Sequence, residues 1–133
     1  MTSTVTYLGD LRTECTHLSS QTKMNTDAPV DNQGKGQAFS PTDQVATALA
    51  SCILTIMGIK AREWEIDLIN TKAEVTKTMG DNPRRITKID IRICFPHKWD
   101  TKTKIRLEKV VTACPVHHSL HPDIEKSIQL EWS

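Results

Sequence analysis

The sequence predicts a single α+β domain, and three patterns lead to that prediction. Two segments near the N-terminus have the alternating texture of β-strands. A long apolar segment at the centre of the chain has the composition of a buried helix. A second pair of strand-like segments then precedes an amphipathic helix and a final strand. The expected order is β-β-(β)-α-β-β-α-α-β, and the 133 residues are the size of one domain.

The first elements are expected to form an N-terminal β-hairpin sheet. Ser3–Leu8 is rich in β-branched and aromatic residues, and a Gly-Asp turn signal follows it. Leu11–Leu18 alternates between two faces, and Gln21–Thr26 is a candidate third strand. Asp27–Gln37 has no period and contains proline and glycine, which indicates a long loop of the kind that often carries function.

The strongest element is a central helix over Pro41–Arg62. Ser40 suits the N-cap, proline suits the first helical position, and Asp43 stands in the capping-box position. Residues from Val45 to Ile59 are apolar or small on every side, and a helix that is apolar all round is buried all round. A domain this small needs a second chain to cover such a helix, so we expect a homodimer. Cys52 lies in the middle of this helix.

A second β-hairpin is expected after the helix. Ile66–Met79 alternates imperfectly, whereas Arg84–Phe95 alternates cleanly, and a Gly-Asp-Asn-Pro turn separates them. Four side chains of the second of these strands are expected to face the core: Ile89, Ile91, Ile93 and Phe95.

The C-terminal part is expected to contain two helices and one strand. Thr101–Cys114 has the pattern of an amphipathic helix, with Cys114 on the buried face. Pro115 ends this helix and can open a short one over Val116–Leu120. In the last strand three side chains are expected to point inward: Ile128, Leu130 and Trp132.

Charge and composition exclude several classes of partner. Lys and Arg number 17 against 16 Asp and Glu, a formal net charge of +1, so no basic surface for nucleic acid or anionic membranes is expected. No uninterrupted apolar run reaches the roughly 18 residues of a membrane span. The first residues lack the basic and apolar regions of a secretory signal, so we expect a cytoplasmic, reducing environment.

The four cysteines are Cys15, Cys52, Cys94 and Cys114, and none belongs to a CxxC pair. This spacing disfavours a zinc site with four thiolates, and a reducing compartment disfavours a disulfide scaffold. Cys15 and Cys94 carry no motif and are interpreted as structural. Cys52 and Cys114 stand in apolar, structured settings, where a cysteine either packs as an inert small hydrophobe or reacts.

Two segments of the chain resemble the OsmC/Ohr family of organic hydroperoxide resistance proteins. The run FSPTDQVATALASC, which ends at Cys52, resembles the helix motif of that family. The run ACPVHHSL, which contains Cys114, resembles its second cysteine segment. The resemblance covers essentially the whole chain and implies one OsmC-like domain over residues 1–133, assembled as an intertwined dimer.

The resemblance also implies a function and a role for each cysteine. Members of the family reduce organic hydroperoxides, so Cys52 would be the peroxidatic thiolate and Cys114 the resolving thiol. No cofactor or metal is implied. The reductant would be an external dithiol, commonly a dihydrolipoyl group, and thus a lipoylated protein is an expected partner.

Two charged groups of the family site are harder to assign in this chain. The family has a glutamate directly after the proline of its helix motif, and Thr42 stands there instead, with Asp43 one residue later. Asp43 and Cys52 fall on opposite helix faces, about 13.5 Å apart along the axis, so Asp43 acts either across a dimer interface or only as a helix cap. The family's catalytic arginine corresponds to Arg12, with Arg85 as a second candidate, and a solvated strand charge is the alternative for Arg12.

Two other functions are compatible with these residues. A redox-sensing or small-ligand-binding dimer of the same fold is favoured by Thr42 in place of the glutamate. A metal-binding protein could use Cys114 with the neighbouring histidines His117, His118 and His121, although exposed histidines without a ligand are the more common case.

Overall fold

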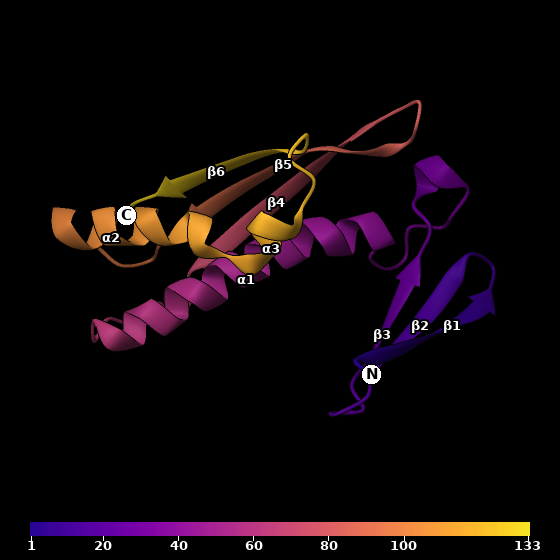
Figure 1. Ribbon diagram of the computed structural model, residues 1–133, viewed down its shortest axis with the longest axis horizontal. Helices are drawn as coiled ribbons and strands as arrows, with labels where there is room; N and C mark the ends of the chain where they lie inside the picture. Colours follow the sequence, from indigo (N-terminus) through magenta and orange to yellow (C-terminus); the bar gives the residue numbers. More distant parts are fainter. The chain divides into compact units, whose positions relative to one another are not determined.

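The computed structural model describes all 133 residues and divides into two compact units. The first unit is Met1–Val45 and the second is Ala46–Ser133 (Figure 1). Groups of strands are separated by helices along the chain, in the expected α+β order. The assignment of all 133 residues to one OsmC-like domain stays a prediction, and each unit is described by itself below.

The first unit is built on a three-stranded antiparallel sheet with the order β1-β2-β3. The strands are β1 (Ser3–Gly9), β2 (Arg12–His17) and β3 (Lys23–Asp27), so the candidate third strand is confirmed. A short 3-10 helix, η1 (Val30–Asn32), lies in the segment expected to be a loop. Asp27, expected at the start of that loop, instead pairs with β2 as the last residue of β3.

Helix α1 (Pro41–Glu63) confirms the predicted central helix. Its start is a capping box, because the Asp43 amide donates to Oγ of Ser40 and the Ser40 amide donates to Oδ2 of Asp43, both at 3.0 Å. The Asp43 carboxylate and the Ser40 hydroxyl thus accept hydrogen bonds from two backbone amides that have no partner within the helix.

One stripe of α1 is buried in the chain, not its whole circumference. Val45 is 37% exposed and Ile59 is 49% exposed, so the single chain does not bury the helix on every side, and its cover by a second chain stays a prediction. The reason is that one sheet covers only one side of a helix. This is the one helix long and apolar enough to cross a membrane, by length and composition only, and 33% of its apolar window is buried. The buried residues have helical spacing: Ala46, Leu49, Ala50, Ile53, Met57 and Ala61.

The second unit contains a three-stranded sheet with the order β4-β5-β6, whose one face is covered by helices (Figure 1). Strand β4 (Lys72–Gly80) is antiparallel to β5 (Arg85–Cys94), and β5 is parallel to β6 (Glu125–Glu131). The strand predicted over Ile66–Met79 begins only at residue 72. Residues 66–71 form a turn instead, in which the Ile69 amide donates to Oδ1 of the Asp67 side chain at 2.8 Å.

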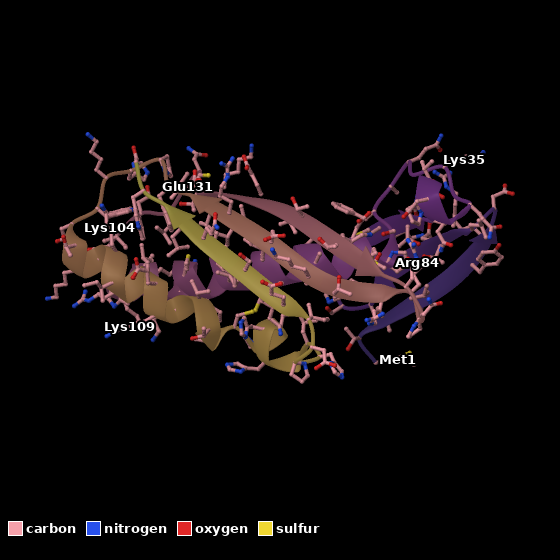
Figure 2. All side chains as sticks on the ribbon, turned by 90° about the horizontal axis from the view of Figure 1, so that it is seen from above. Met1, Lys35, Arg84, Lys104, Lys109 and Glu131 are labelled. Atoms are coloured by element: carbon pink, nitrogen blue, oxygen red, sulfur yellow. The ribbon has the colours of Figure 1, made fainter.

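Helix α2 (Thr101–Val110) is shorter than the predicted helix. Its N-cap is Asp100, whose Oδ1 accepts a hydrogen bond from the Thr103 amide at 2.8 Å. A 3-10 turn, η2 (Val111–Ala113), continues the chain to Cys114, and α3 (Pro115–Ser119) follows. Pro115 cannot donate a backbone hydrogen bond, so the α-helical pattern cannot run through it. Figure 2 shows Lys104 and Lys109 on α2 and Glu131 on β6.

The hydrophobic core of the second unit lies between this sheet and its helices. The inward alternation predicted for β5 is confirmed, since Ile89, Ile91 and Ile93 are at most 1% exposed. The Phe95 ring stacks on Trp132 with 4.6 Å between ring centroids. The residues that meet the β5 isoleucines come from α1, from α2 and from the segment before α3: Leu49, Ile53, Met57, Leu107, Val110 and Cys114.

Replacement of Leu107 by alanine tests this packing. Leu107 is fully buried, so Leu107→Ala is expected to lower the free energy of unfolding by about 2–5 kcal/mol in urea denaturation. Ile105, on the same helix, is 46% exposed, and Ile105→Ala is expected to cost much less. Equal losses for the two variants would contradict the burial described for α2.

Candidate active site

The structure brings the Cys52 and Cys114 thiols together within the second unit. Cys52 is partly buried on α1, Cys114 is fully buried before α3, and both are free thiols. The Cys52 side chain is near enough to Cys114 to raise the pKa of the Cys114 thiol. The two cysteines are 62 positions apart in the sequence, and the packing of α1 and α2 on one sheet closes that separation. The two cysteines are thus neighbours in the second unit, and their catalytic roles stay predictions.

Cys114 is held in place as the N-cap residue of α3. Its backbone is extended, with φ −70° and ψ 126°, as favoured for a residue before proline. Its Sγ accepts a hydrogen bond from the His117 amide at 3.4 Å, and its carbonyl oxygen accepts from the His118 amide at 3.3 Å. The start of α3 thus fixes the direction of the Cys114 sulfur. In the middle of a helix the backbone amides are already bonded within the helix and could not hold a sulfur in this way.

The surroundings of Cys114 keep its thiol protonated at neutral pH. Burial raises the pKa of Cys114, and the hydrogen bond and the charge of Cys52 raise it further. The backbone amides of His117 and Val116 oppose this effect but do not outweigh it. A protonated thiol next to a second sulfur suits a group that reacts second, after the neighbouring sulfur has been oxidised.

The His117 ring, close after Cys114, does not supply a cation to the thiols. Burial, with the nearby charges of Lys126 and His118, lowers the pKa of His117, so its ring is neutral at neutral pH. The His117 and His118 rings face each other edge-on at 5.7 Å, while the His121 ring lies 3.7 Å from the Asp123 carboxylate. No three His, Cys, Asp or Glu side chains converge as a metal-ligand set. The metal-binding alternative therefore has no geometric support.

Arg12 lies on β2 beside a buried carboxylate of the first unit. Its Nε is 3.8 Å from Oδ2 of Asp27, its register partner on β3. Its Nη2 donates a hydrogen bond to Oε1 of Gln37 at 3.1 Å. Asp27 is fully buried and Arg12 is 40% exposed, so this cation has a defined partner and is more than a solvated strand charge.

Arg85, the second candidate for the catalytic arginine, is hydrogen-bonded within the turn that precedes it. Its Nη1 donates to the carbonyl oxygens of Asp81 and Pro83, both at 2.9 Å, in the connection between β4 and β5. Asp43 likewise has a structural role in the capping box described above. The catalytic roles of Arg12 and Asp43 stay predictions.

Sequence reasoning missed Asp27 and Gln37. Both fell in the segment assigned to a loop, and neither carries a motif. Their relation to Arg12 depends on the register of β2 against β3, which sets Arg12 opposite Asp27. Only a prediction of that register could have found them, because cross-strand neighbours follow from strand pairing.

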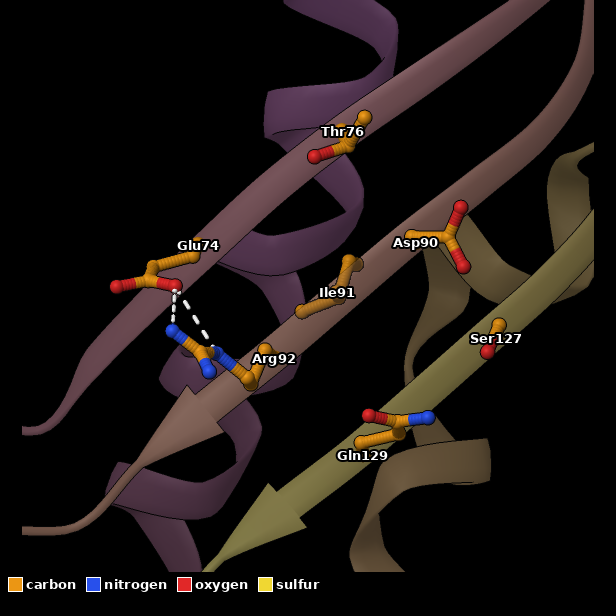
Figure 3. A pocket seen from close by; sticks show the side chains of 7 residues that line it. All are labelled: Glu74, Thr76, Asp90, Ile91, Arg92, Ser127 and Gln129. Carbon is orange, nitrogen blue, oxygen red and sulfur yellow. Dashed lines mark hydrogen bonds and ion pairs between the residues drawn. The ribbon is translucent and has the colours of Figure 1, made fainter.

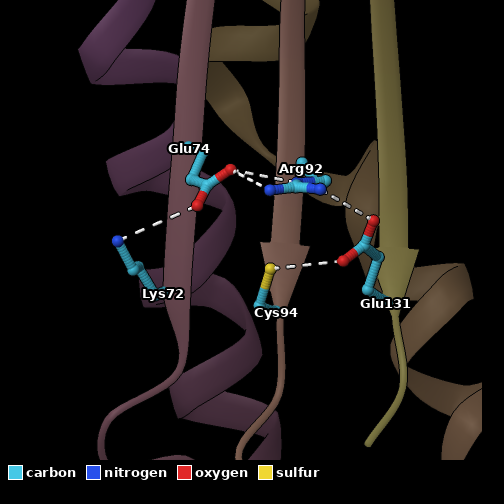
Figure 4. A network of polar contacts seen from close by, with 5 residues as sticks. All are labelled: Lys72, Glu74, Arg92, Cys94 and Glu131. Atoms are coloured by element: carbon cyan, nitrogen blue, oxygen red, sulfur yellow. Dashed lines mark hydrogen bonds and ion pairs between the residues drawn. The ribbon is translucent and has the colours of Figure 1, made fainter.

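Cys94 is on the outer face of β5, inside a network of charges (Figure 4). Its Sγ donates to Oε2 of Glu131 at 3.6 Å, while Arg92 forms ion pairs with Glu131 and Glu74, and Lys72 pairs with Glu74. Partial burial and the Glu131 carboxylate raise the pKa of Cys94. These contacts support the interpretation of Cys94 as structural, since they favour the unreactive thiol.

A small hollow of about 160 Å³ lies on the same outer face (Figure 3). The Arg92 guanidinium at its wall is turned toward Glu74, and the Asp90 carboxylate lies 3.2 Å from Nζ of Lys88. Its charges thus already have partners, as in a solvated sheet face. The lining residues come from all three strands: Glu74, Thr76, Asp90, Ile91, Arg92, Ser127 and Gln129.

Comparison with known proteins identifies relatives in sequence and in fold. The model of the family described as OsmC-like protein matches residues 34–129. A solved structure from Psychrobacter arcticus 273-4, a proposed osmotic stress induced and detoxification response protein, is 54% identical. The match covers 98% of this chain and 96% of that one, with a TM-score of 0.95. A search of curated proteins found no match.

More distant structures share the fold. An organic hydroperoxide resistance protein OsmC from Legionella pneumophila is 13% identical, with a TM-score of 0.76 and coverage of 98% and 97% of the two chains. An organic hydroperoxide resistance protein from Elizabethkingia anophelis, with thiocyanate bound, is 13% identical. Its TM-score is 0.77, and the match covers 100% of this chain and 97% of that one.

The contact between the two thiols predicts a measurable shift. In Cys52→Ala the hydrogen bond and the charge of Cys52 are lost, so the pKa of Cys114 should fall. Alkylation of Cys114, followed by peptide mass spectrometry over a pH series, should then have its midpoint at a lower pH than in the native chain. Cys94→Ala is the control and should leave the midpoint in place. An unchanged midpoint in Cys52→Ala would argue against the contact.

Proposed function

The chain belongs to the OsmC-like protein family, and from this premise we propose that it is a thiol-dependent peroxidase that reduces organic hydroperoxides through Cys52 and Cys114. The observation that carries the proposal is the contact between the two thiols in the second unit. Two thiols in contact can form a disulfide without a large rearrangement, since the bond needs close sulfurs and compatible backbones. Organic hydroperoxide resistance proteins of the same fold support the choice of substrate.

In the proposed first step, the Cys52 thiolate attacks the terminal oxygen of the hydroperoxide. An S–O bond forms as the O–O bond breaks, and the leaving alkoxide takes up a proton to become an alcohol. Cys52 is oxidised to a sulfenic acid, and the peroxide is reduced. The apolar helix around Cys52 favours an alkyl peroxide over a small polar one.

In the second step the Cys114 thiol condenses with the sulfenic acid. An S–S bond forms, the S–O bond breaks, and water leaves. An external dithiol, such as a dihydrolipoyl group on a lipoylated protein, would then reopen the disulfide by two exchange reactions and be oxidised to its own disulfide. The cycle requires no cofactor held by the protein and suits a reducing compartment such as the cytoplasm.

The raised pKa of Cys114 supports this division of roles. A thiol that stays protonated is a poor first nucleophile, because the thiolate is the reactive form. It remains available to attack the sulfenic acid of the neighbouring residue. Arg12 is the proposed cation that favours the Cys52 thiolate, since it is the one arginine before α1 in the sequence.

We also propose that the active form is a homodimer. Large apolar side chains are exposed on α1 and on the first unit, more than isolated surface residues would need. The family resemblance implies that a second copy of the chain covers these side chains. These exposed residues include Val5, Tyr7, Leu8, Met24, Phe39, Val45 and Ile59.

A redox sensor is the second candidate function, favoured by Thr42 where the family has a glutamate. A sensor needs Cys52 to oxidise but does not need rapid turnover. The two functions are separated by steady-state peroxide consumption with a dithiol such as dihydrolipoamide. Oxidation of Cys52 without sustained consumption would favour the sensor.

Mapping of oxidised cysteines tests the proposed chemistry. One equivalent of cumene hydroperoxide should convert two of the four free thiols into a Cys52–Cys114 disulfide, seen by peptide mass spectrometry. In Cys114→Ser the sulfenic acid at Cys52 should accumulate and be trapped by dimedone. In Cys52→Ser, peroxide consumption should be lost.

Cys94→Ser is the matched control for these variants, because Cys94 lies in the same unit but outside the thiol pair. It should form the disulfide and consume peroxide at the native rate. Loss of activity in this control, or a disulfide that includes Cys94, would contradict the proposed roles.

Light scattering tests the proposed assembly. The mass in solution should be twice the chain mass of 15.0 kDa at micromolar concentration. Ile59→Asp should weaken the assembly, because a charge would replace an exposed apolar side chain of α1. A folded monomer of the native chain at that concentration would refute the dimer.

A further inference from the structure

The charges of the second unit are distributed unevenly between its sheet and helix α2. On the outer face of the sheet the cations are neutralised, since Lys72 and Arg92 both form ion pairs with Glu74. Residues 98–109, in contrast, carry five Lys or Arg and two acidic residues, and none of these cations forms an ion pair. The formal net charge of +1 for the whole chain therefore conceals a local excess of positive charge at α2.

The exposed side of α2 presents several of these cations together. Leu107 and Val110 are the buried residues of the helix. A rotation of about 100° per residue places Lys102, Ile105 and Lys109 on the opposite side, and all three are exposed. The cations of this side are therefore free to meet a partner in solution.

Two aromatic rings hold further cations at the edges of this surface. Nζ of Lys104 lies 5.6 Å from the centroid of the Trp132 ring. The guanidinium carbon of Arg106 lies 5.3 Å from the centroid of the Trp64 ring. A ring face attracts a cation without neutralising its charge, and a cation held in this way loses less freedom when it meets an anion. The residues of this surface form the basic face of α2: Lys102, Lys104, Ile105, Arg106 and Lys109.

The chemistry of the basic face of α2 fits an acidic protein surface. Ile105 is 46% exposed among the cations, and an apolar centre with charged residues around it is typical of protein interfaces. A membrane would need more apolar side chains to insert, but Leu107 and Val110 are packed in the core. In a two-fold contact a second copy of the chain would bring the same cations together, and like charges repel.

The basic face of α2 leads along the chain to the thiol pair. Lys109 precedes Cys114 by five residues, and a rise of about 1.5–2 Å per residue leaves the two backbones within roughly 10 Å along the helix direction. Cys52 is the neighbour of Cys114 in the same unit. A protein bound at this face would thus hold a reactive group near both sulfurs, and a tethered group reacts at a high effective concentration.

We propose that the basic face of α2 is the docking surface for an acidic protein that carries the reducing dithiol. The inference rests on the proposed peroxidase function, because the bound partner would deliver its dithiol to the Cys52–Cys114 disulfide. One thiolate of the partner attacks a sulfur of that disulfide, forms a mixed disulfide and releases the other cysteine as a thiolate. The second thiol of the partner then displaces the remaining cysteine, so that both cysteines are reduced and the partner dithiol is oxidised to a disulfide.

The experiment compares two peptides of equal length, each with one dihydrolipoyl-lysine. The flanking residues are glutamates in one peptide and glutamines in the other. The full chain is first oxidised to the Cys52–Cys114 disulfide, and the second-order rate of its reduction is measured. At low ionic strength the glutamate peptide is expected to react about tenfold faster than the glutamine peptide. About 1 M salt should remove this advantage, because it screens charges beyond roughly 3 Å.

Charge reversals locate the docking surface. Lys102→Glu and Lys109→Glu are each expected to lower the advantage of the glutamate peptide about three- to tenfold. Lys72→Glu is the matched control, because it changes the net charge equally at a side chain that is 73% exposed on the sheet, and it should keep the advantage. Free dihydrolipoamide has no charge to be attracted and should reduce the disulfide of every variant at the native rate, which shows that the thiol pair is intact.

A second measurement does not depend on the disulfide. A glutamate peptide without the dithiol is titrated into the reduced native chain, and the backbone amide NMR signals of α2 should shift. In Lys109→Glu these shifts should be lost, whereas Lys72→Glu should keep them. Shifts caused by phosphatidylserine vesicles but not by the peptide would overturn the proposed partner and identify an anionic membrane instead.

Equal rates with the two peptides in the native chain would overturn the docking surface and leave the peroxidase proposal intact. Equal losses in Lys72→Glu and Lys109→Glu would overturn it as well, since only the net charge would then matter. Failure of the native chain to form the Cys52–Cys114 disulfide would instead refute the proposed function. The NMR titration would still test the docking surface in that case, so the two failures are distinguishable.

Discussion

The packing of one stripe of α1 against the isoleucines of β5 is the interaction on which the rest of the second unit depends. It buries Leu49, Ile53 and Met57, and it fixes the rotation of the helix about its axis. Cys52 stands at the border of this stripe, so it is held rigidly and is still partly exposed. A shift of the helix by one residue would turn the thiol about 100° away from Cys114.

The two thiols share one contact but have different surroundings. Cys114 is sealed in the core, with its pKa raised by burial, whereas Cys52 keeps partial access to solvent. A buried thiol is protected from external oxidants and still reacts with a neighbour that has become electrophilic. Cys94 shows the contrast, because it is outside the hydrophobic core, yet partial burial and a nearby carboxylate raise its pKa. Exposure alone therefore does not decide how readily a cysteine thiol ionises.

At the start of α1, Asp43 has a structural role as a helix cap, although its place in the sequence suggests a catalytic role. Asp43 completes a capping box with Ser40, a role that any soluble helix could require. The carboxylate beside Arg12 comes from β3 instead, at a position without a motif. The pairing of β2 with β3 sets Asp27 opposite Arg12. This register leaves no motif in the sequence between the two strands.

Local patterns in the sequence determined the element order, the start of α1, the inward face of β5 and the two cysteines of interest, because periodicity, caps and motifs act over a few residues. They failed at residues 66–71, where turn chemistry replaced the expected strand, and at Asp27, whose place depends on strand register. Only the tertiary structure decided which stripe of α1 is buried and that Cys114 meets Cys52. Both depend on how distant segments pack on a shared sheet, and apolar residues on every side of a helix do not specify which side packs.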